Sequence, residues 1–307
     1  MLTNALPNVE AKFASKKKFS KNTAWVYVGL LLSSLIVILP FLVVLLTSLK
    51  TQQDATKYPL AWFGKDGLSL EGYRIALTTM IPVELLGGAK MPILLVGFFW
   101  TFIVSVVPTL CSVMVASLAA FAFAKIRFKC SKIFFNILIF TMMIPGTILL
   151  IPHYLMYEQL GWVHNEYNSL LALIIPGLWG GAGQIFFIRQ FMYSIPNSLI
   201  EAAKMDGLNW FKIYTKIILP LIVPAILCQG LLGFIAHYNA YLGPLMYLSG
   251  EYKTLQILIQ TFIQQYAANN IPARMAISIV SIIPTLLIYV IFQKYFVEGI
   301  STTGMKL

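Results

Sequence analysis

Six stretches without a charged residue divide the chain, and each is long enough to form a membrane-spanning helix. They cover residues 22–49, 91–124, 133–157, 167–188, 217–250 and 275–293. A helix needs about 20 apolar residues to cross the hydrocarbon of a bilayer. We therefore predict an all-α polytopic membrane protein with one transmembrane domain at 24–296. Its six helices are expected at about 24–49, 93–123, 133–152, 168–188, 220–248 and 275–294.

The polar segments that join these helices differ in charge. If the N-terminus lies inside the cell, the inner segments hold 15 Lys and Arg but 4 Asp and Glu, and the outer segments hold 7 basic and 7 acidic residues. Inner loops of membrane proteins carry an excess of Lys and Arg, so both termini are predicted to be cytoplasmic. The inner segments include a basic tail at 1–23, a loop at 189–219 and a C-terminal tail at 297–307. The longest outer loop is 50–92.

Composition supports a membrane protein and excludes several other classes. The chain is 59 % hydrophobic and 11 % charged, whereas soluble proteins are about 25 % charged. The formal charge of +11 comes from the excess of Lys and Arg in the predicted inner segments. No basic-aromatic pattern indicates nucleic-acid binding. The sequence has no phosphate-binding loop of the form G-x-x-x-x-G-K-S/T and no metal-binding motif. Cys111, Cys130 and Cys228 fall in helices or at the inner face, so no structural disulfide is expected.

Residues 198–220 form a polar stretch that must leave the membrane between the fourth and fifth predicted helices. Ser198 and Glu201 have the spacing of a capping box, in which each side chain accepts a hydrogen bond from the backbone at a helix start. Gly207 is expected to end that helix, because glycine adopts positive φ at little cost. A second helix is expected from about Asn209 to Pro220. The stretch therefore predicts a short helix, a glycine corner and a helix that re-enters the membrane.

The short helix resembles the E-A-A loop of ABC importer permeases, whose core is E-A-A-x-x-D-G followed later by L-P. Here the motif spans residues 201–207, and Leu219-Pro220 follows downstream. The resemblance implies a type I ABC importer permease fold, in which this segment is a cytoplasmic coupling helix that docks on a separate ATP-binding subunit. The residues that it assigns to docking are Glu201, Ala202, Ala203, Asp206 and Gly207. A cytoplasmic loop with ordinary helix caps is the simpler alternative.

A second motif lies in the outer half of the fifth predicted helix. Carbohydrate-importer permeases of the maltose type typically show F-x-x-x-W-N-x-F-x-x-P-L here, and this chain keeps the spacing over 234–245 with tyrosines in place of W and the second F. Aromatic faces and amide groups suit sugar binding. The resemblance makes Tyr238, Asn239 and Tyr241 a candidate substrate path. The alternative is a buried polar cluster that joins helices, with the membrane sugar site on a partner chain.

Together, the two resemblances imply the permease subunit of an ATP-driven carbohydrate importer in a bacterial plasma membrane. Its partners would be a second homologous permease, two ATP-binding subunits and an extracytoplasmic solute-binding protein, which the loop 50–92 faces in that family. The partner subunits would bind ATP and Mg, and this chain would carry no cofactor, no metal and no catalytic residue.

Two alternatives to a carbohydrate importer stay open. The first is an importer of a non-sugar solute, such as an amino acid, phosphate or a metal, which would share the motif at 201–207. The second is a secondary carrier or an intramembrane enzyme. The predicted helices contain no Asp or Glu, and ion-coupled carriers usually rely on ionisable residues in the membrane. The composition therefore favours an energy source on another chain.

Overall fold

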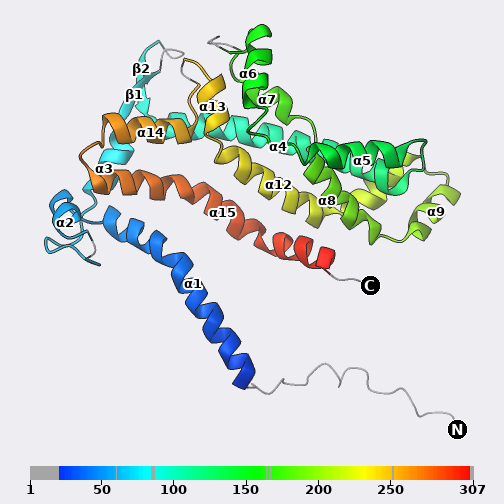
Figure 1. The fold of residues 1–307 in the computed structure, drawn as a ribbon, viewed down its shortest axis with the longest axis horizontal. Coiled ribbons are helices and arrows are strands. Elements are labelled where there is room, and N and C mark those ends of the chain that lie inside the picture. The colour runs from blue at the N-terminus through cyan, green and yellow to red at the C-terminus, as the bar shows by residue number, and fades with distance from the viewer. Residues whose placement is uncertain are drawn as a thin grey trace.

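The computed structural model describes residues 21–59, 61–83, 87–163, 165, 168–250 and 252–304 (Figure 1). The tail expected at 1–23 lies almost entirely outside these residues, and the tail expected at 297–307 lies partly outside them. The body is built from long helices: α4 (Ile93–Lys125), α8 (Ala182–Tyr193), α12 (Val223–Tyr238) and α15 (Ile271–Gly304). α4 packs against α8 and α12, and α15 packs against α12.

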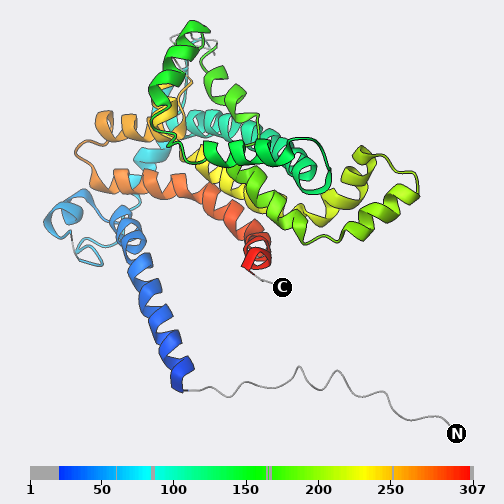
Figure 2. The ribbon, with the colours of Figure 1, turned by 45° about the vertical axis from the view of Figure 1, so that its right-hand side comes forward.

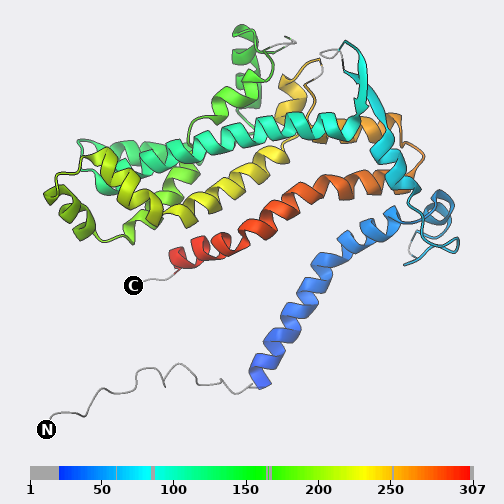
Figure 3. The same ribbon diagram turned by 180° about the vertical axis from the view of Figure 1, so that it is seen from behind.

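Helix α1 (Lys21–Ser48) diverges from this body and approaches it only near its C-terminal end, against α15 (Figures 1 and 2). Nearly all of its side chains from Trp25 to Val43 are exposed. A helix that is apolar all round is stable only in an apolar environment, such as lipid or another membrane protein. The view from behind shows the same arrangement, with α4 running along the whole body (Figure 3).

Four segments of the described chain are long and apolar enough to cross a membrane. They are Trp25–Ser48, Ile93–Lys125, Leu171–Tyr193 and Ile271–Tyr295. The third of them joins α7 (Leu171–Gly177) to α8. A fifth span exists if Trp210–Leu221 and Val223–Tyr238, which meet at 76°, count as one. The chain is therefore a predominantly helical polytopic membrane protein, and the division into six spans stays a prediction.

The span expected at 133–152 is not one continuous helix. α5 (Ser131–Thr141) has 11 residues, so it rises about 16 Å, roughly half of the hydrocarbon thickness. Turns follow around Pro145 and Gly146, where proline lacks the N–H that a helix needs and glycine favours other conformations. α6 (Leu150–Gln159) begins only after these turns. Apolar length alone thus overestimated the helix in this segment.

The helix expected at 220–248 is also divided. α11 (Leu219–Leu221) is followed by Ile222, where the chain bends before α12 begins. Pro220 and Pro224 lie in the first turns of α11 and α12, where the missing N–H of proline costs nothing. α12 ends at Tyr238, and α13 (Leu242–Tyr247) forms separately.

Two of the segments that were predicted to lie outside are folded rather than extended loops. Segment 50–92 contains α2 (Gln52–Lys57), α3 (Glu71–Thr78) and an antiparallel hairpin of β1 (Met80–Val83) and β2 (Ala89–Pro92). This hairpin is a departure from the all-α prediction. α14 (Leu255–Gln265) lies in the segment that follows α13 and packs against α4.

Two buried charged residues hold the start of segment 50–92 together. Lys50 donates from Nζ to the backbone oxygens of Tyr58 and Pro59, at 3.2 and 3.3 Å. The backbone N–H of Asp66 donates to Asp54 Oδ2 at 3.1 Å, and this hydrogen bond lowers the pKa of the Asp54 carboxyl. Residue 64 next to the Asp54 carboxylate must be glycine, because a Cβ at this position would lie 2.3 Å from Asp54 Oδ2. The segment therefore has a fixed local structure.

Gly180 allows the link between α7 and α8 to touch the backbone of α4. A Cβ at Gly180 would lie 2.6 Å from the backbone nitrogen of Ala116. We expect Gly180→Ala to lower the free energy of unfolding by about 1–3 kcal/mol, because α4 and the link must separate. Gly181→Ala is the matched control, since the nearest atom would be 3.7 Å away. Thermal unfolding of the two purified variants checks this, and equal midpoints would contradict it.

Candidate functional site

A short exposed helix, α9 (Asn197–Met205), lies at the end of the body opposite the β-hairpin (Figure 1). It begins two residues earlier than a capping box with Ser198 as its N-cap would require. Pro196 is the N-cap, with φ −60° and ψ 137°, and no side chain caps the helix. Ser198 therefore lies inside the first turn, and the capping box expected from Ser198 and Glu201 is wrong. The fixed φ of Pro196 starts the helix instead.

The C-terminal end of α9 is a Schellman motif centred on Gly207. Gly207 has φ +77°, and its N–H donates to the Lys204 oxygen at 3.0 Å. The N–H of Leu208 donates to the Ala203 oxygen, also at 3.0 Å. In this motif the residue after the glycine makes an apolar contact with the last helical turn, and Leu208 packs against the same core as Ala203. The predicted glycine corner is therefore confirmed.

The chain turns back into the body immediately after this corner. Asn209 caps α10 (Trp210–Ile213) by accepting a hydrogen bond from the N–H of Lys212 at 2.8 Å. A π-helix (Tyr214–Ile218) and α11 continue it towards the bend at Ile222. The helix start that was predicted near Asn209 is thus confirmed. The π-helix and the bend were not foreseen.

Three faces of α9 have different surroundings. Ile200 and Ala203 are 5 % and 3 % exposed, and they anchor the helix in a core shared with α4 and α8. The outward face is apolar and carries Leu199, Ala202 and Met205, of which Met205 is 89 % exposed.

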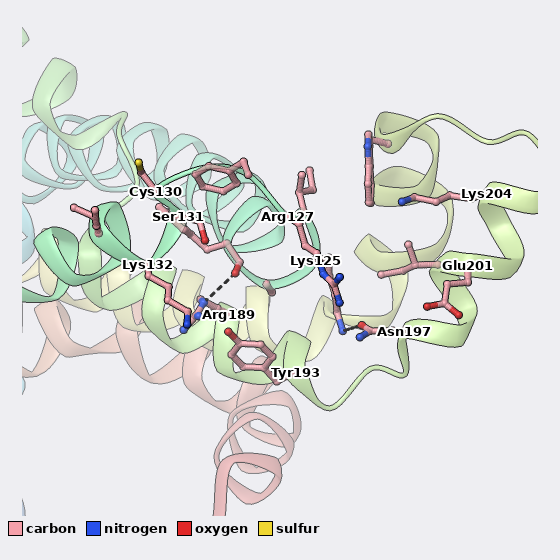
Figure 4. Close-up of a pocket in the computed structure, with 17 residues that line it drawn as sticks. Lys125, Arg127, Cys130, Ser131, Lys132, Arg189, Tyr193, Asn197, Glu201 and Lys204 are labelled. Carbon is pink, nitrogen blue, oxygen red and sulfur yellow. Dashed lines mark hydrogen bonds between the residues drawn. The ribbon is translucent and has the colours of Figure 1, made fainter.

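The third face borders a groove of about 1050 Å³ and carries Asn197, Glu201 and Lys204 (Figure 4). The five predicted docking residues do not share one surface. Ala202, Asp206 and Gly207 are exposed away from the groove, Glu201 is exposed beside it, and Ala203 is buried.

Helix α9 is tied to the end of α4 by Lys125. Lys125 Nζ donates to the backbone oxygen of Ile195 at 2.7 Å and to Asn197 Oδ1 at 3.0 Å. These two acceptors lie on either side of the α9 N-cap. The last residue of α4 therefore fixes the first residue of α9.

A second connection runs from the C-terminal end of α9 to α4 through aromatic rings. Lys204 Nζ lies 3.8 Å from the centroid of the Trp210 ring, and that ring meets Phe121 of α4 edge-on at 6.1 Å. The Tyr214 hydroxyl is 2.5 Å from Ser117 Oγ, also in α4. Both ends of the α9 corner are therefore attached to one long helix, so movement of α9 would displace α4.

Lys125→Met is expected to loosen the N-terminal end of α9. Hydrogen bonds that involve a charged group contribute about 1.5–3 kcal/mol, so amide hydrogen exchange in 197–205 should accelerate about tenfold or more. Lys129→Met is the matched control, because Lys129 is exposed and does not line the groove. Exchange rates that are the same in both variants would mean that Lys125 does not hold α9.

Arg189 of α8 supports the opposite wall of the groove. Its Nε donates to the Phe123 oxygen at 3.3 Å, and its guanidinium lies 3.7 Å from the centroid of the Phe135 ring of α5. Lys125 and Arg189 were counted among the 15 basic residues of the predicted inner segments, and no contact was predicted for them. Each is the charge that ends a long apolar run, and that position was the available signal.

The three residues of the candidate substrate path are not brought together. Tyr238 is 1 % exposed, and its hydroxyl donates to the Ser281 oxygen at 2.7 Å. Asn239 is exposed and donates to the Ile235 oxygen at 3.0 Å. Tyr241 is 38 % exposed. Tyr238 thus joins α12 to α15 in this structure, and only Asn239 and Tyr241 offer surface to a solute.

In the part of the chain that the structure describes, no group of three or more His, Cys, Asp or Glu side chains could hold a metal ion. The geometry of the site instead presents an exposed amphipathic corner, attached to a membrane helix at both ends. Such a site suits a contact with another protein rather than chemistry on a small molecule.

These features define a class: a polytopic helical membrane protein with a helical corner outside its spans. Residues 112–302 match the model of the family described as "Binding-protein-dependent transport system inner membrane component". The chain belongs to this family. It is therefore the membrane component of an import system that also includes an ATPase and a solute-binding protein.

Individual relatives agree with the family over most of the chain. The arabinooligosaccharides transport system permease protein AraQ of Halalkalibacterium halodurans is 27 % identical over 95 % of this chain and 99 % of that protein. The polygalacturonan/rhamnogalacturonan transport system permease protein YtcP of Bacillus subtilis is 29 % identical over 92 % and 96 %.

A solved structure has the same fold. It is the crystal structure of a bacterial ABC transporter involved in the import of the acidic polysaccharide alginate. One of its chains matches with a TM-score of 0.74 and 24 % identity, over 91 % of this chain and 99 % of that one. The predicted type I ABC permease fold is therefore confirmed.

Proposed function

We propose that this chain is the permease subunit of an ATP-driven, solute-binding-protein-dependent importer of a carbohydrate, an oligosaccharide or related glycoside. It forms half of the translocation pathway. The observation that carries this proposal is the preformed corner at α9, which exposes Leu199, Ala202 and Met205 and is attached to α4 at both ends. The names of both relatives described above support a carbohydrate as the solute.

The proposed topology places α9 and both termini in the cytoplasm of a bacterial plasma membrane. Lys125, Arg127, Lys132, Arg189 and Lys204 line the groove at the α9 end of the body, and Glu201 is the one acidic residue in that lining. An excess of Lys and Arg marks the cytoplasmic side of a membrane protein. The β-hairpin and α14 then face the outside, where a solute-binding protein would dock.

In the proposed mechanism α9 is a coupling helix that receives the movement of an ATP-binding subunit. The assembly contains a second homologous permease and two ATP-binding subunits, which bind ATP and Mg and carry out hydrolysis. This chain supplies no catalytic residue and binds no cofactor. Ala202, Asp206 and Gly207 belong to the docking surface. Glu201 borders the groove and Ala203 anchors α9 in the core, so neither is placed on that surface.

The coupling route to the membrane follows the contacts of the α9 corner. Displacement of α9 acts on α4 through Lys125 at one end and through Trp210 and Phe121 at the other. The bend at Ile222 separates this corner from α12. α4 and α12 can therefore change their relative position while the corner moves as a unit. Asn239 and Tyr241, at the far end of α12, are proposed to line the solute path.

Reconstitution of the complex, purified with its partner subunits, in sealed vesicles tests this function. We expect uptake of a saccharide that requires ATP on the cytoplasmic side and the solute-binding protein on the other. If the complex imports an amino acid or phosphate but no saccharide, the proposal of a carbohydrate as the solute would be wrong. Uptake that proceeds without ATP would contradict the proposal and favour a secondary carrier.

A further inference from the structure

The groove beside α9 is strongly basic (Figure 4). It lies between the turn that joins α4 to α5, the end of α8, and the inner side of α9. Glu201 is the one acidic residue among the residues that line it. The basic residues that line it are Lys125, Arg127, Lys132, Arg189 and Lys204.

Two of these basic side chains have no hydrogen-bond or ion-pair partner within the described chain, whereas the other three have contacts. Lys125 donates a hydrogen bond to Asn197 of α9, and Arg189 donates one to the Phe123 oxygen. Lys204 lies over the ring of Trp210. Arg127 and Lys132 are exposed, and within the described chain neither makes a hydrogen bond or an ion pair. Both lie next to the start of α5, whose first turn contains no acidic residue. The groove therefore presents uncompensated positive charge.

An apolar surface begins at the edge of the groove. Ile133 lines the groove and is 60 % exposed. Phe134, Ile137 and Phe140 continue along α5 and are also more than half exposed. Residues spaced by three and four lie on one face of a helix, so α5 offers a continuous apolar strip. A ligand with an anionic head and hydrocarbon tails would match both surfaces.

We propose that this groove binds the phosphate headgroup of an anionic phospholipid of the inner leaflet, and that the acyl chains lie along α5. Arg127 and Lys132 contact the phosphate. An acidic protein surface would satisfy the cations but leave the apolar strip of α5 unexplained. The outward face of α9, which carries Leu199 and Met205, points away from the groove, so docking of an ATP-binding subunit there leaves the site open. The inference uses the proposed topology, and it does not depend on what the protein transports.

Lipid retention by the purified complex tests the site. The complex is equilibrated with vesicles of phosphatidylglycerol and phosphatidylcholine, extracted, and the phospholipid that stays bound is measured by native mass spectrometry. Each charge near an anionic lipid surface contributes about a fivefold change in binding. The double variant R127Q/K132Q should therefore lose phosphatidylglycerol about 30-fold. Lys216→Gln is the matched control, because Lys216 is exposed but does not line the groove.

Further arms of the experiment separate the alternatives. The charge-conserving variant R127K/K132R should retain the lipid, which would show that charge rather than altered folding causes the loss. Millimolar inorganic phosphate should not displace phosphatidylglycerol, because the acyl chains contribute to binding. Displacement by phosphate alone, or equal retention by R127Q/K132Q and the control, would overturn the proposal. Release of the ATP-binding subunit from R127Q/K132Q with lipid retention unchanged would also overturn it and make the groove a protein interface.

Discussion

Gly207→Val is expected to abolish ATP-driven uptake while the chain still inserts in the membrane. Gly207 has φ +77°, a left-handed conformation that costs an ordinary L-residue about 1–2 kcal/mol, and a β-branched residue more. The substitution should change the angle between α9 and α10, since both flank this residue. Because 1.4 kcal/mol corresponds to a factor of ten, uptake by reconstituted vesicles should fall at least tenfold.

Gly207→Asn is the control for this variant. Asparagine enters the left-handed region more easily than other residues, and no atom lies within 4 Å of a Cβ at this position. The Asn variant should therefore keep most of the uptake. Normal uptake in Gly207→Val, or equal losses in both variants, would show that the corner geometry is not what transport requires.

Met205→Glu is expected to separate the permease from its ATP-binding subunit. Met205 is 89 % exposed on the outward face of α9. Burial of such a side chain in an interface stabilises it by about 1.5–3 kcal/mol, and a buried unpaired carboxylate would add a further cost. The affinity for the purified ATP-binding subunit should therefore fall about 10- to 100-fold in a titration with the permease in nanodiscs.

Met205→Leu serves as the matched variant, because leucine keeps the apolar volume and should bind nearly as well as the original chain. Because Met205 is exposed, neither substitution should disturb the fold, and the two variants should have the same thermal unfolding midpoint. A loss of affinity in Met205→Glu would then not be due to misfolding. An unchanged affinity in Met205→Glu would mean that the ATP-binding subunit does not contact this face of α9.

The local features of the α9 corner could be predicted from the sequence. A glycine after an apolar helical turn and an asparagine two residues later act on their own neighbours, so Gly207 and Asn209 were placed correctly. The capping box failed for an equally local reason. Pro196 is the N-cap, two residues before the N-cap position that the pattern of Ser198 and Glu201 predicted.

The lengths of the helices were less predictable. An apolar run shows where a segment prefers lipid, but it does not show where the helix inside it ends or bends. α5 ends at Thr141, and the segment after Leu219 bends at Ile222, within runs that looked continuous. Lipid-exposed and buried apolar residues also look alike in sequence, so the separation of α1 from the body could not be foreseen.

The groove and the burial of Tyr238 between helices both depend on contacts between distant parts of the chain. Lys125 and Asn197 are 72 residues apart, and Tyr238 and Ser281 are 43 residues apart. Neither pair has a local signature. The motif around Tyr238 left two roles open, a solute path and a buried polar cluster that joins helices, because the same ring and hydroxyl suit both. Only the tertiary structure distinguishes the two roles.

Mild extraction of the chain from its native membrane, followed by identification of the proteins that copurify, tests the central claim most directly. We expect an ATP-binding subunit and a second permease in the same complex, and we expect Met205→Glu to lose the first and keep the second. A chain that purifies alone, under conditions in which other membrane complexes stay intact, would contradict the role of α9 as a coupling helix.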